Sequence, residues 1–136
     1  MTYTCPSFSI DLPAEALDTS SYCFVLPVKE RFHPSLVIRY EPLPTKKTFA
    51  QYVPEQVEKM GKELKMFQLL RDPEYHNDHA SILYEWGEGD ARFRQTQIYM
   101  DRGTHYYLIT TTELATASQD YSQLFQQMIR TFRPNR

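Results

Sequence analysis

The residues best suited to chemistry lie in the segment EYHNDHA, which contains Glu74, His76, Asp78 and His79. Carboxylate and imidazole side chains are ligands that divalent metal ions take in proteins. Their spacing matches no known metal-binding loop, however, and no second cluster of such residues would complete a coordination shell. We therefore expect a polar turn that contains two histidines, and no bound metal.

Cysteine is the other candidate for chemistry. Cys5 or Cys23 could act as a nucleophile beside His33 or His105, but the spacing carries no signature of a catalytic family. Cys23 alternates with Phe24 in an apolar stretch, which favours a small buried side chain. The chain has four glycines, which form no phosphate-binding loop, and no G-x-S-x-G elbow. We predict a protein that is not an enzyme and that uses no cofactor.

The segment ARFRQTQIYM, residues 91–100, has an unusual pattern for a strand. Alternation places Phe93, Gln95, Gln97 and Tyr99 on one face, so that two amides lie between two aromatic rings. Two interpretations follow from the residues. The face is either the polar outer side of a sheet, or a surface for a partner that is apolar but carries small polar groups.

Six strands are predicted from alternating apolar and polar residues, at 8–12, 22–28, 35–41, 80–86, 91–100 and 105–112, with a further short strand within 67–74. The turns GEGD at 87–90 and DRG at 101–103 join the last three strands as hairpins, which makes the sheet antiparallel. On the face opposite the amides, Arg92 and Arg94 are expected to pair with Glu85 across strands.

Two helices are predicted. Apolar residues recur at helical spacing from Phe49 to Phe67, after Thr48 as the N-cap, and Pro54 is expected to kink this helix or delay its regular start. The second helix follows Thr116 and Gln119, which have capping-box spacing, and Pro134 stops it. We predict an α+β fold in one domain, residues 1–136: a sandwich built on an antiparallel sheet with two main helices.

Two short helices cannot cover both faces of such a sheet. Phe24 and Leu26, from the strand at 22–28, and Val37, from the next strand, could extend the amide-bearing face without a helix above them. That surface would suit a hydrophobic helix as its partner. Gln56 borders the apolar stripe of the first helix.

Charge and hydropathy exclude several classes of function. A net charge of −2 predicts no nucleic-acid binding, which requires clustered positive charge. The N-terminal residues MTYTCPSFSI lack the basic and apolar regions of a secretory signal, and no apolar segment precedes Cys5 to support a lipid anchor. No window reaches the roughly 20 apolar residues that span a bilayer. We expect a cytoplasmic protein without a membrane anchor, in which Cys5 and Cys23 are two reduced thiols or meet on adjacent strands.

Several segments in the same order resemble one family. They are FSIDLPAE, FVLP, SLVIRYEPLP followed by TFAQYVPEQVEKM, FQLL, ILYEW, RQTQIYMDRGTHYYLITTT and the closing MIRTF. Together they span nearly the whole chain. The chain resembles the DcrB-related group that includes the Eag-type chaperones of type VI secretion, which have a Mog1/PsbP-like fold.

This resemblance implies a small cytoplasmic adaptor, usually dimeric, that shields the N-terminal transmembrane segments of a secreted effector. An exposed apolar helix would otherwise aggregate in water before export. In such chaperones, strand residues and glutamines hold the helices by imitating the contacts that helices make in membranes. The matching positions in this chain are Phe24, Leu26, Val37, Gln56, Gln95 and Gln97.

Two alternatives stay open. The same surface could bind a small molecule, in which case a closed pocket of about 300 Å³ or more with convergent polar groups is expected. A regulatory module of the Mog1 type would instead bind a folded partner through another surface, and substitutions on the amide-bearing face would then have no effect.

Overall fold

The structure is a computed structural model that describes residues 2–4, 9–11, 13–14, 21–26, 28, 32–44, 47–117 and 119–134. Its elements in chain order are β1 (Thr2–Thr4), β2 (Ser9–Asp11), β3 (Ser21–Val25), β4 (Ser35–Pro42), α1 (Phe49–Glu63), β5 (Gln68–Leu69), β6 (Glu74–Tyr75), β7 (His79–Glu88), β8 (Ala91–Asp101), β9 (His105–Leu114) and α2 (Ser122–Arg130).

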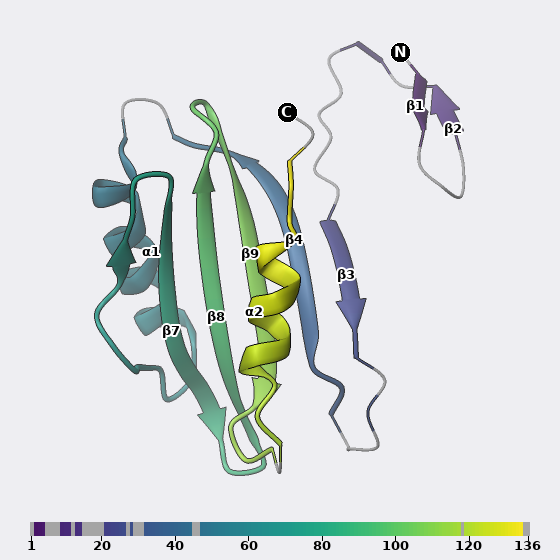
Figure 1. Ribbon diagram of the computed structural model, residues 1–136. Helices are drawn as coiled ribbons and strands as arrows, with labels where there is room; N and C mark the ends of the chain where they lie inside the picture. Colours follow the sequence, from purple (N-terminus) through teal and green to yellow (C-terminus); the bar gives the residue numbers. More distant parts are fainter. Residues whose placement is uncertain are drawn as a thin grey trace.

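The main sheet has seven strands in the order β3-β4-β9-β8-β7-β5, and β6 also pairs with β7 (Figure 1). All described pairs in this sheet are antiparallel. Gly89 and Gly103 take positive φ angles of 58° and 88° in the two turns that join β7, β8 and β9. The predicted hairpins and the α+β fold are therefore confirmed.

α1 packs against one face of the sheet. Val53, which is fully buried, meets Ala80, Ile82 and Tyr84 of β7 and Tyr99 of β8 in one hydrophobic cluster. Figure 1 shows α1 behind the β7 side of the sheet, while no described helix lies behind β4 and β3. α1 therefore covers only part of this face.

α2 packs against the opposite face. Tyr121 and Phe125 are buried with Leu36 of β4 and Ile109 of β9 in a second hydrophobic cluster. In Figure 1, α2 lies in front of β9, between β8 and β4. The two helices thus lie on opposite sides of the sheet, and their clusters are separated by it.

The predicted start of α1 is confirmed. The backbone N–H of Thr48 donates to Oε1 of Gln51 at 3.1 Å, and the helix runs through Pro54 to Glu63. The register of apolar residues in α1 matches the predicted stripe, with Phe49, Tyr52, Val57, Met60 and Leu64 packed against the cluster.

The predicted start of α2 is wrong. The helix begins at Ser122 after Tyr121, and not after Thr116. Glu113 accepts the backbone N–H of Tyr121 at 3.2 Å, and Asp120 accepts that of Ser122 at 2.8 Å. Asp120 therefore accepts the first N–H of the helix, and Glu113, in β9 eight residues before Tyr121, accepts the N–H of the N-cap residue, a contact that local spacing does not reveal.

The N-terminal strands differ in extent from the prediction. The strand predicted at 22–28 ends at Val25. In the segment predicted as strand 8–12, the structure has β2, which pairs with β1 in a separate two-stranded sheet. Cys5, Phe8 and Leu12 lie outside the described residues.

Candidate functional site

The strand register brings the two amides of β8 into two rows that cross the sheet. Gln95 lies opposite Thr112 of β9, which lies opposite Ser35 of β4, which lies opposite Val25 of β3. Gln97 begins the second row, which continues through Thr110, Val37 and Cys23. Directly opposed residues share a face. We call these eight residues the open face: Cys23, Val25, Ser35, Val37, Gln95, Gln97, Thr110 and Thr112.

The open face is the part of the α1 side that α1 does not cover. The hydrophobic cluster beneath α1 takes its strand residues from β7, β8 and β9, and neither Val25 nor Val37 belongs to it. Val25 is 50% exposed, and the amides of β8 are half-buried. The face therefore changes in character across its width, from amides and hydroxyls beside α1 to aliphatic side chains at β3.

Gln95 is held at both ends of its amide. Nε1 of Trp86 donates to its Oε1 at 2.8 Å, and its Nε2 donates to Oγ1 of Thr112 at 2.8 Å. The chain of bonds joins three strands, β7, β8 and β9. Because both polar ends are occupied within the sheet, the orientation of Gln95 is fixed.

Gln97 is held at one end. The hydroxyl of Tyr99 donates to its Oε1 at 2.7 Å. Burial raises the pKa of Tyr99 well above the ordinary value of 10.0, so this hydroxyl stays protonated and remains a donor. Among the described residues, none accepts a hydrogen bond from the amide nitrogen of Gln97, which leaves two N–H donors for a partner.

The two aromatic residues that flank the amides, Phe93 and Tyr99, differ from each other in burial. Tyr99 is 2% exposed and lies beneath α1, edge-on to Phe49. Its role is therefore to orient Gln97, and our expectation that it forms part of a contact surface is corrected. Phe93 is half-buried between Trp86 and Phe32, at ring-centroid distances of 5.3 and 5.2 Å, and closes one end of the face.

Gln56 lies one helical turn after Tyr52, on the same side of α1. The hydroxyl of Tyr52 is 2.9 Å from that of Tyr106 in β9, so this side of the helix faces β9. Gln56 is half-buried in the structure. It therefore stands at the border between α1 and the open face.

The predicted placement of Phe24 and Leu26 on this face is wrong. Phe24 pairs with Leu36, which is buried against α2, and Leu26 also packs against that cluster. Val37 does lie on the open face, opposite Cys23. Side chains alternate along each strand as predicted. Strand pairing, however, decides which alternate residues face α1 and which face α2, and the pattern of one strand does not reveal this.

Cys23 is exposed and free, which corrects the expectation of a buried side chain. It belongs to the last described strand at one edge of the sheet, beyond the reach of α1. Alternation shows which residues of a strand share a face, but it does not show whether a helix covers that face.

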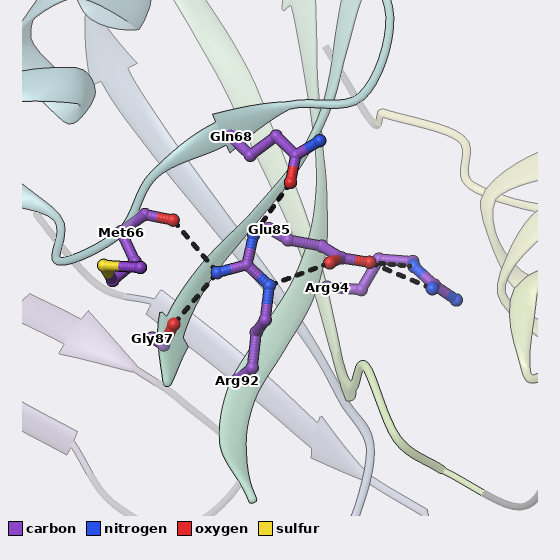
Figure 2. Close-up of polar contacts among 6 residues, drawn as sticks. All are labelled: Met66, Gln68, Glu85, Gly87, Arg92 and Arg94. Atoms are coloured by element: carbon purple, nitrogen blue, oxygen red, sulfur yellow. Dashed lines mark hydrogen bonds and ion pairs between the residues drawn. The ribbon is translucent and has the colours of Figure 1, made fainter. Parts of the chain in front are cut away.

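A network of ions lies on the α2 side, behind the amides. Glu85 accepts from Nε of Arg92 at 3.0 Å and from Nε of Arg94 at 3.0 Å, which confirms the predicted cross-strand pairs. Figure 2 shows that Arg92 also donates to the backbone oxygens of Met66 at 3.0 Å and Gly87 at 2.9 Å. Arg92 thus ties the segment after α1 to the end of β7.

Glu113 extends this network to the start of α2. It is 6% exposed, and Nη1 of Arg94 lies 3.7 Å from its Oε1. Burial raises the pKa of Glu113 above its usual value of 4.5, although the N–H of Tyr121 and the charge of Arg94 act in the opposite direction.

Two cavities lie on the α2 side. One, of about 270 Å³, is lined by apolar side chains of β3, β4, β9 and the end of α2, including Phe24 and Phe132. The other, of about 440 Å³, is lined by charged and polar groups that include Arg71, Arg94 and Glu113. Two of these charged groups also form ion pairs with other side chains of the protein: Arg71 with Glu74 at 3.1 Å, and Arg94 with Glu85.

The histidine segment forms an exposed turn. The rings of His76 and His79 stack at 4.4 Å, and Nδ1 of His79 is 2.8 Å from Oδ1 of Asp78. Within the described parts of the chain, no group of three or more histidine, cysteine or acidic residues is arranged to hold a metal ion. No described helix is long and apolar enough to cross a membrane.

The sequence identifies the family to which the chain belongs. The sequence pattern of the DcrB family matches residues 8–131. The chain belongs to the DcrB family. No curated protein sequence matches it.

Among the solved structures that share the fold of this DcrB-family chain, two are compared with it. PA94 from Pseudomonas aeruginosa, a protein of unknown function with a suggested regulatory role, is 23% identical, with a TM-score of 0.80 and coverage of 100% of this chain and 97% of PA94. The cyanobacterial PsbP protein CyanoP from Synechocystis sp. PCC 6803 is 9% identical, with a TM-score of 0.55 and coverage of 90% of this chain and 96% of CyanoP. The predicted Mog1/PsbP-like fold is confirmed.

Sequence reasoning missed Trp86, which holds Gln95, and five residues of the open face: Cys23, Val25, Ser35, Thr110 and Thr112. The run of three threonines at 110–112 was a usable signal, because alternation must place two of them on one face. Trp86 could not be found in this way, since its bond to Gln95 depends on the register of β7 against β8.

Proposed function

We propose that this DcrB-family protein is a chaperone or adaptor that binds the apolar transmembrane helices of a secreted effector on its open face. The observation that carries the proposal is the gradient across that face, from Gln97, Thr110 and Thr112 beside α1 to Val37 and Val25 at the edge. In the proposed role, type VI secretion effectors are the cargo, and the protein keeps their N-terminal segments soluble until export.

The chemistry of the face supports an apolar helix as cargo. Aliphatic side chains remove apolar surface from water at about 25 cal/mol per Å². Hydroxyls and the amide of Gln97 can bond to the small polar side chains and carbonyls that membrane helices present to one another. No formal charge lies among the eight residues of the open face, so an apolar helix meets no desolvated ion there.

The dimensions of the face agree with one helix per chain. The four adjacent strands of the face, β8, β9, β4 and β3, span about 14 Å from axis to axis at a spacing of about 4.8 Å. A helix with its side chains is about 10–12 Å across. The helix would lie beside α1, with Gln56 at the border between them.

The test is co-expression with an effector fragment that either retains or lacks its hydrophobic N-terminal segment, followed by affinity capture. The proposal expects capture only when the segment is present. Light scattering on the captured complex then gives its stoichiometry. Equal capture of both fragments, or of neither, contradicts the proposal.

A second candidate function, small-molecule binding, is favoured by the cavity of about 440 Å³ on the α2 side. Its volume lies within the range of small-ligand sites, about 300–1,000 Å³, and its charged and polar lining would suit a small polar ligand. If it is correct, Ser122→Trp would fill the cavity and abolish ligand binding in a thermal-shift screen of small polar metabolites, while capture of the effector fragment would be unchanged. Effector capture that depends on Gln97 would instead favour the open face.

A further inference from the structure

The cavity of about 440 Å³ on the α2 side lies between the segment after β5 and the start of α2. Leu83 of β7 and Thr96 of β8, which are directly paired, form part of its lining. The backbone N–H of Leu70 donates to the oxygen of Leu83 at 3.0 Å, and Glu113 of β9 accepts the N–H of Tyr121 at 3.2 Å. Both ends of the cavity are therefore attached to the sheet.

Two arginines give the cavity cationic donors. Arg94 directs its Nε and Nη2 to Oε2 of Glu85, at 3.0 and 2.9 Å (Figure 2). Arg71 pairs with Glu74 through its Nε at 3.1 Å, and no hydrogen bond within the described part of the chain uses its two Nη groups. A guanidinium has five N–H donors. Each arginine therefore keeps donors for an anionic group of a ligand.

The start of α2 supplies negative charge to the same cavity. Oδ1 of Asp120 accepts the backbone N–H of Ser122 at 2.8 Å. The N–H and the hydroxyl of Ser122 hold the pKa of Asp120 below its usual value of 3.8, so this carboxylate is charged at neutral pH. A carboxylate accepts about four hydrogen bonds. Asp120 is exposed and can therefore accept further bonds from an ammonium group.

One pair of opposite charges in the cavity does not close. Arg94 and Glu113 lie directly opposite each other on β8 and β9, but Nη1 of Arg94 is 3.7 Å from Oε1 of Glu113. That distance is too long for a hydrogen bond. A ligand that carries both a donor and an acceptor can bond to these two groups together.

The arrangement of charges selects a class of ligand. An anion without a positive group would meet Asp120 and Glu113, and a cation without a negative group would meet Arg71 and Arg94. Like charges that face one another count against such ligands. A ligand with one group of each sign has a partner for both.

We propose that this cavity binds a small zwitterion with a free ammonium and a free carboxylate. The carboxylate bonds to Arg71 and Arg94, and the ammonium bonds to Asp120 and Glu113. A free amino acid and a dipeptide share this chemistry. The proposal rests on the second candidate function, small-molecule binding, and names its ligand; it does not involve the open face.

Titration of the full chain with L-glutamine and with L-alanyl-L-glutamine, followed by NMR chemical shifts, tests the proposal and distinguishes the two sources. At least one of them should bind with a Kd of about 1 mM or below and should shift the amide signals of Thr96 and Ser122. The N-acetyl derivative of the better ligand lacks the ammonium, and its C-terminal amide lacks the carboxylate. Each derivative should bind about tenfold more weakly, because it loses charge-assisted hydrogen bonds.

Two variants assign the ends of the ligand. Asp120→Asn should weaken binding of the zwitterion about fivefold and leave binding of the N-acetyl derivative unchanged. Arg71→Gln should weaken binding of the zwitterion to a similar degree and leave binding of the C-terminal amide unchanged. Arg102→Gln is the matched control, since it removes the same charge from an exposed side chain in the turn between β8 and β9. It should leave every Kd unchanged.

The proposal is overturned if neither zwitterion binds, if either derivative binds as tightly as its parent, or if the shifts centre on Val37 of the open face. These titrations contain no effector, so their failure is distinct from a failure of effector capture. If a ligand of another class from the thermal-shift screen binds in the cavity, the second candidate function stands and the assignment of a zwitterion alone is wrong.

Discussion

Gln95 and Gln97 lie two positions apart on one strand, but their neighbours give them different roles. Gln95 completes a chain of hydrogen bonds from Trp86 to Thr112, and Gln97 is held through its oxygen by Tyr99. One amide therefore stabilises the sheet, and the other offers its N–H groups to a partner. Substitution of the two should separate stability from binding.

Gln97→Leu is expected to weaken capture of the effector segment about tenfold, since it removes a hydrogen bond worth about 1 kcal/mol and can leave a partner group unpaired. Its melting temperature should fall by roughly 3–5 °C, because the buried hydroxyl of Tyr99 loses its acceptor. Gln95→Leu is the control and should lower the melting temperature more, because Trp86 and Thr112 lose their partner. Isothermal calorimetry and thermal unfolding measure the two effects. If the two substitutions changed effector affinity equally and melting temperature equally, the separate roles of Gln95 and Gln97 would be contradicted.

Glu113 predicts a dependence of stability on pH. Burial raises its folded pKa above the usual 4.5, so the folded state retains a proton that the unfolded state has released. Stability from this group is therefore present at low pH and is lost as pH rises above about 4.5 through the folded pKa. Glu113→Gln cannot ionise, and its amide oxygen can still accept the N–H of Tyr121.

The free energy of unfolding of Glu113→Gln, relative to wild type, should therefore rise between pH 4.5 and pH 7 in urea titrations. The difference between the two proteins cancels the titration of acids that do not interact with Glu113. A relative stability that falls with pH would mean that the pairing with Arg94 outweighs burial.

At the scale of elements, Arg92 secures the connection between α1 and the sheet. Its guanidinium donates to Glu85, to the backbone of Met66 and Gly87, and to Oε1 of Gln68 at 3.2 Å. A lysine has no planar set of donors and cannot make these bonds together. The position of α1, and with it one border of the open face, depends on this side chain.

Arg92→Lys should lower the free energy of unfolding by about 1–3 kcal/mol, as expected for loss of hydrogen bonds to a charged group in a half-buried network. Arg71→Lys is the matched control. Its pair with Glu74 is about half exposed, so the change should be within about 0.5 kcal/mol. Chemical denaturation measures both, and similar losses in the two variants would show that the network around Arg92 has no special weight.

Gly87 shows how closely these elements approach one another. It has a φ of 94°, and a Cβ built there would lie 2.1 Å from the backbone oxygen of Ala91. Its N–H also donates to the oxygen of Lys65 at 2.7 Å. A side chain at this position would therefore be incompatible both with the backbone conformation and with the end of the β7–β8 hairpin.

At the scale of the whole molecule, the proposed function assigns cargo binding to the α1 side of the sheet and no cargo contact to the α2 side. The α2 side contains the ion network and the second hydrophobic cluster. The α1 side contains the first cluster and the open face. Cargo should therefore protect one side of the sheet and leave the exterior of α2 unchanged.

Hydroxyl-radical footprinting measures this difference. On addition of the effector segment, oxidation of Val37 and Val25 should fall at least threefold. Leu124, which is 43% exposed on α2, provides the internal control and should be oxidised at the same rate in both states. Protection of Leu124 without protection of Val37 would place the cargo on the other side of the sheet.

Much of the fold could be predicted from local patterns. Alternation identified β7, β8 and β9, and helical spacing after Thr48 identified α1, because these segments are long and each has one buried side. The start of α2 could not be predicted, because the N–H of its N-cap residue, Tyr121, is accepted by Glu113, eight residues earlier in β9. A contact at this separation falls outside the capping patterns that local spacing shows.

The sequence by itself determined that Phe93, Gln95, Gln97 and Tyr99 share one face of a strand, since side chains alternate along any strand. Only the tertiary structure decided which residues of other strands join them. Pairing placed Val37 with the amides and Phe24 on the opposite side, and packing of α1 buried Tyr99 but left Gln97 accessible. The physical reason is that alternation is a local property of the backbone, whereas register and coverage depend on contacts between segments far apart in the chain.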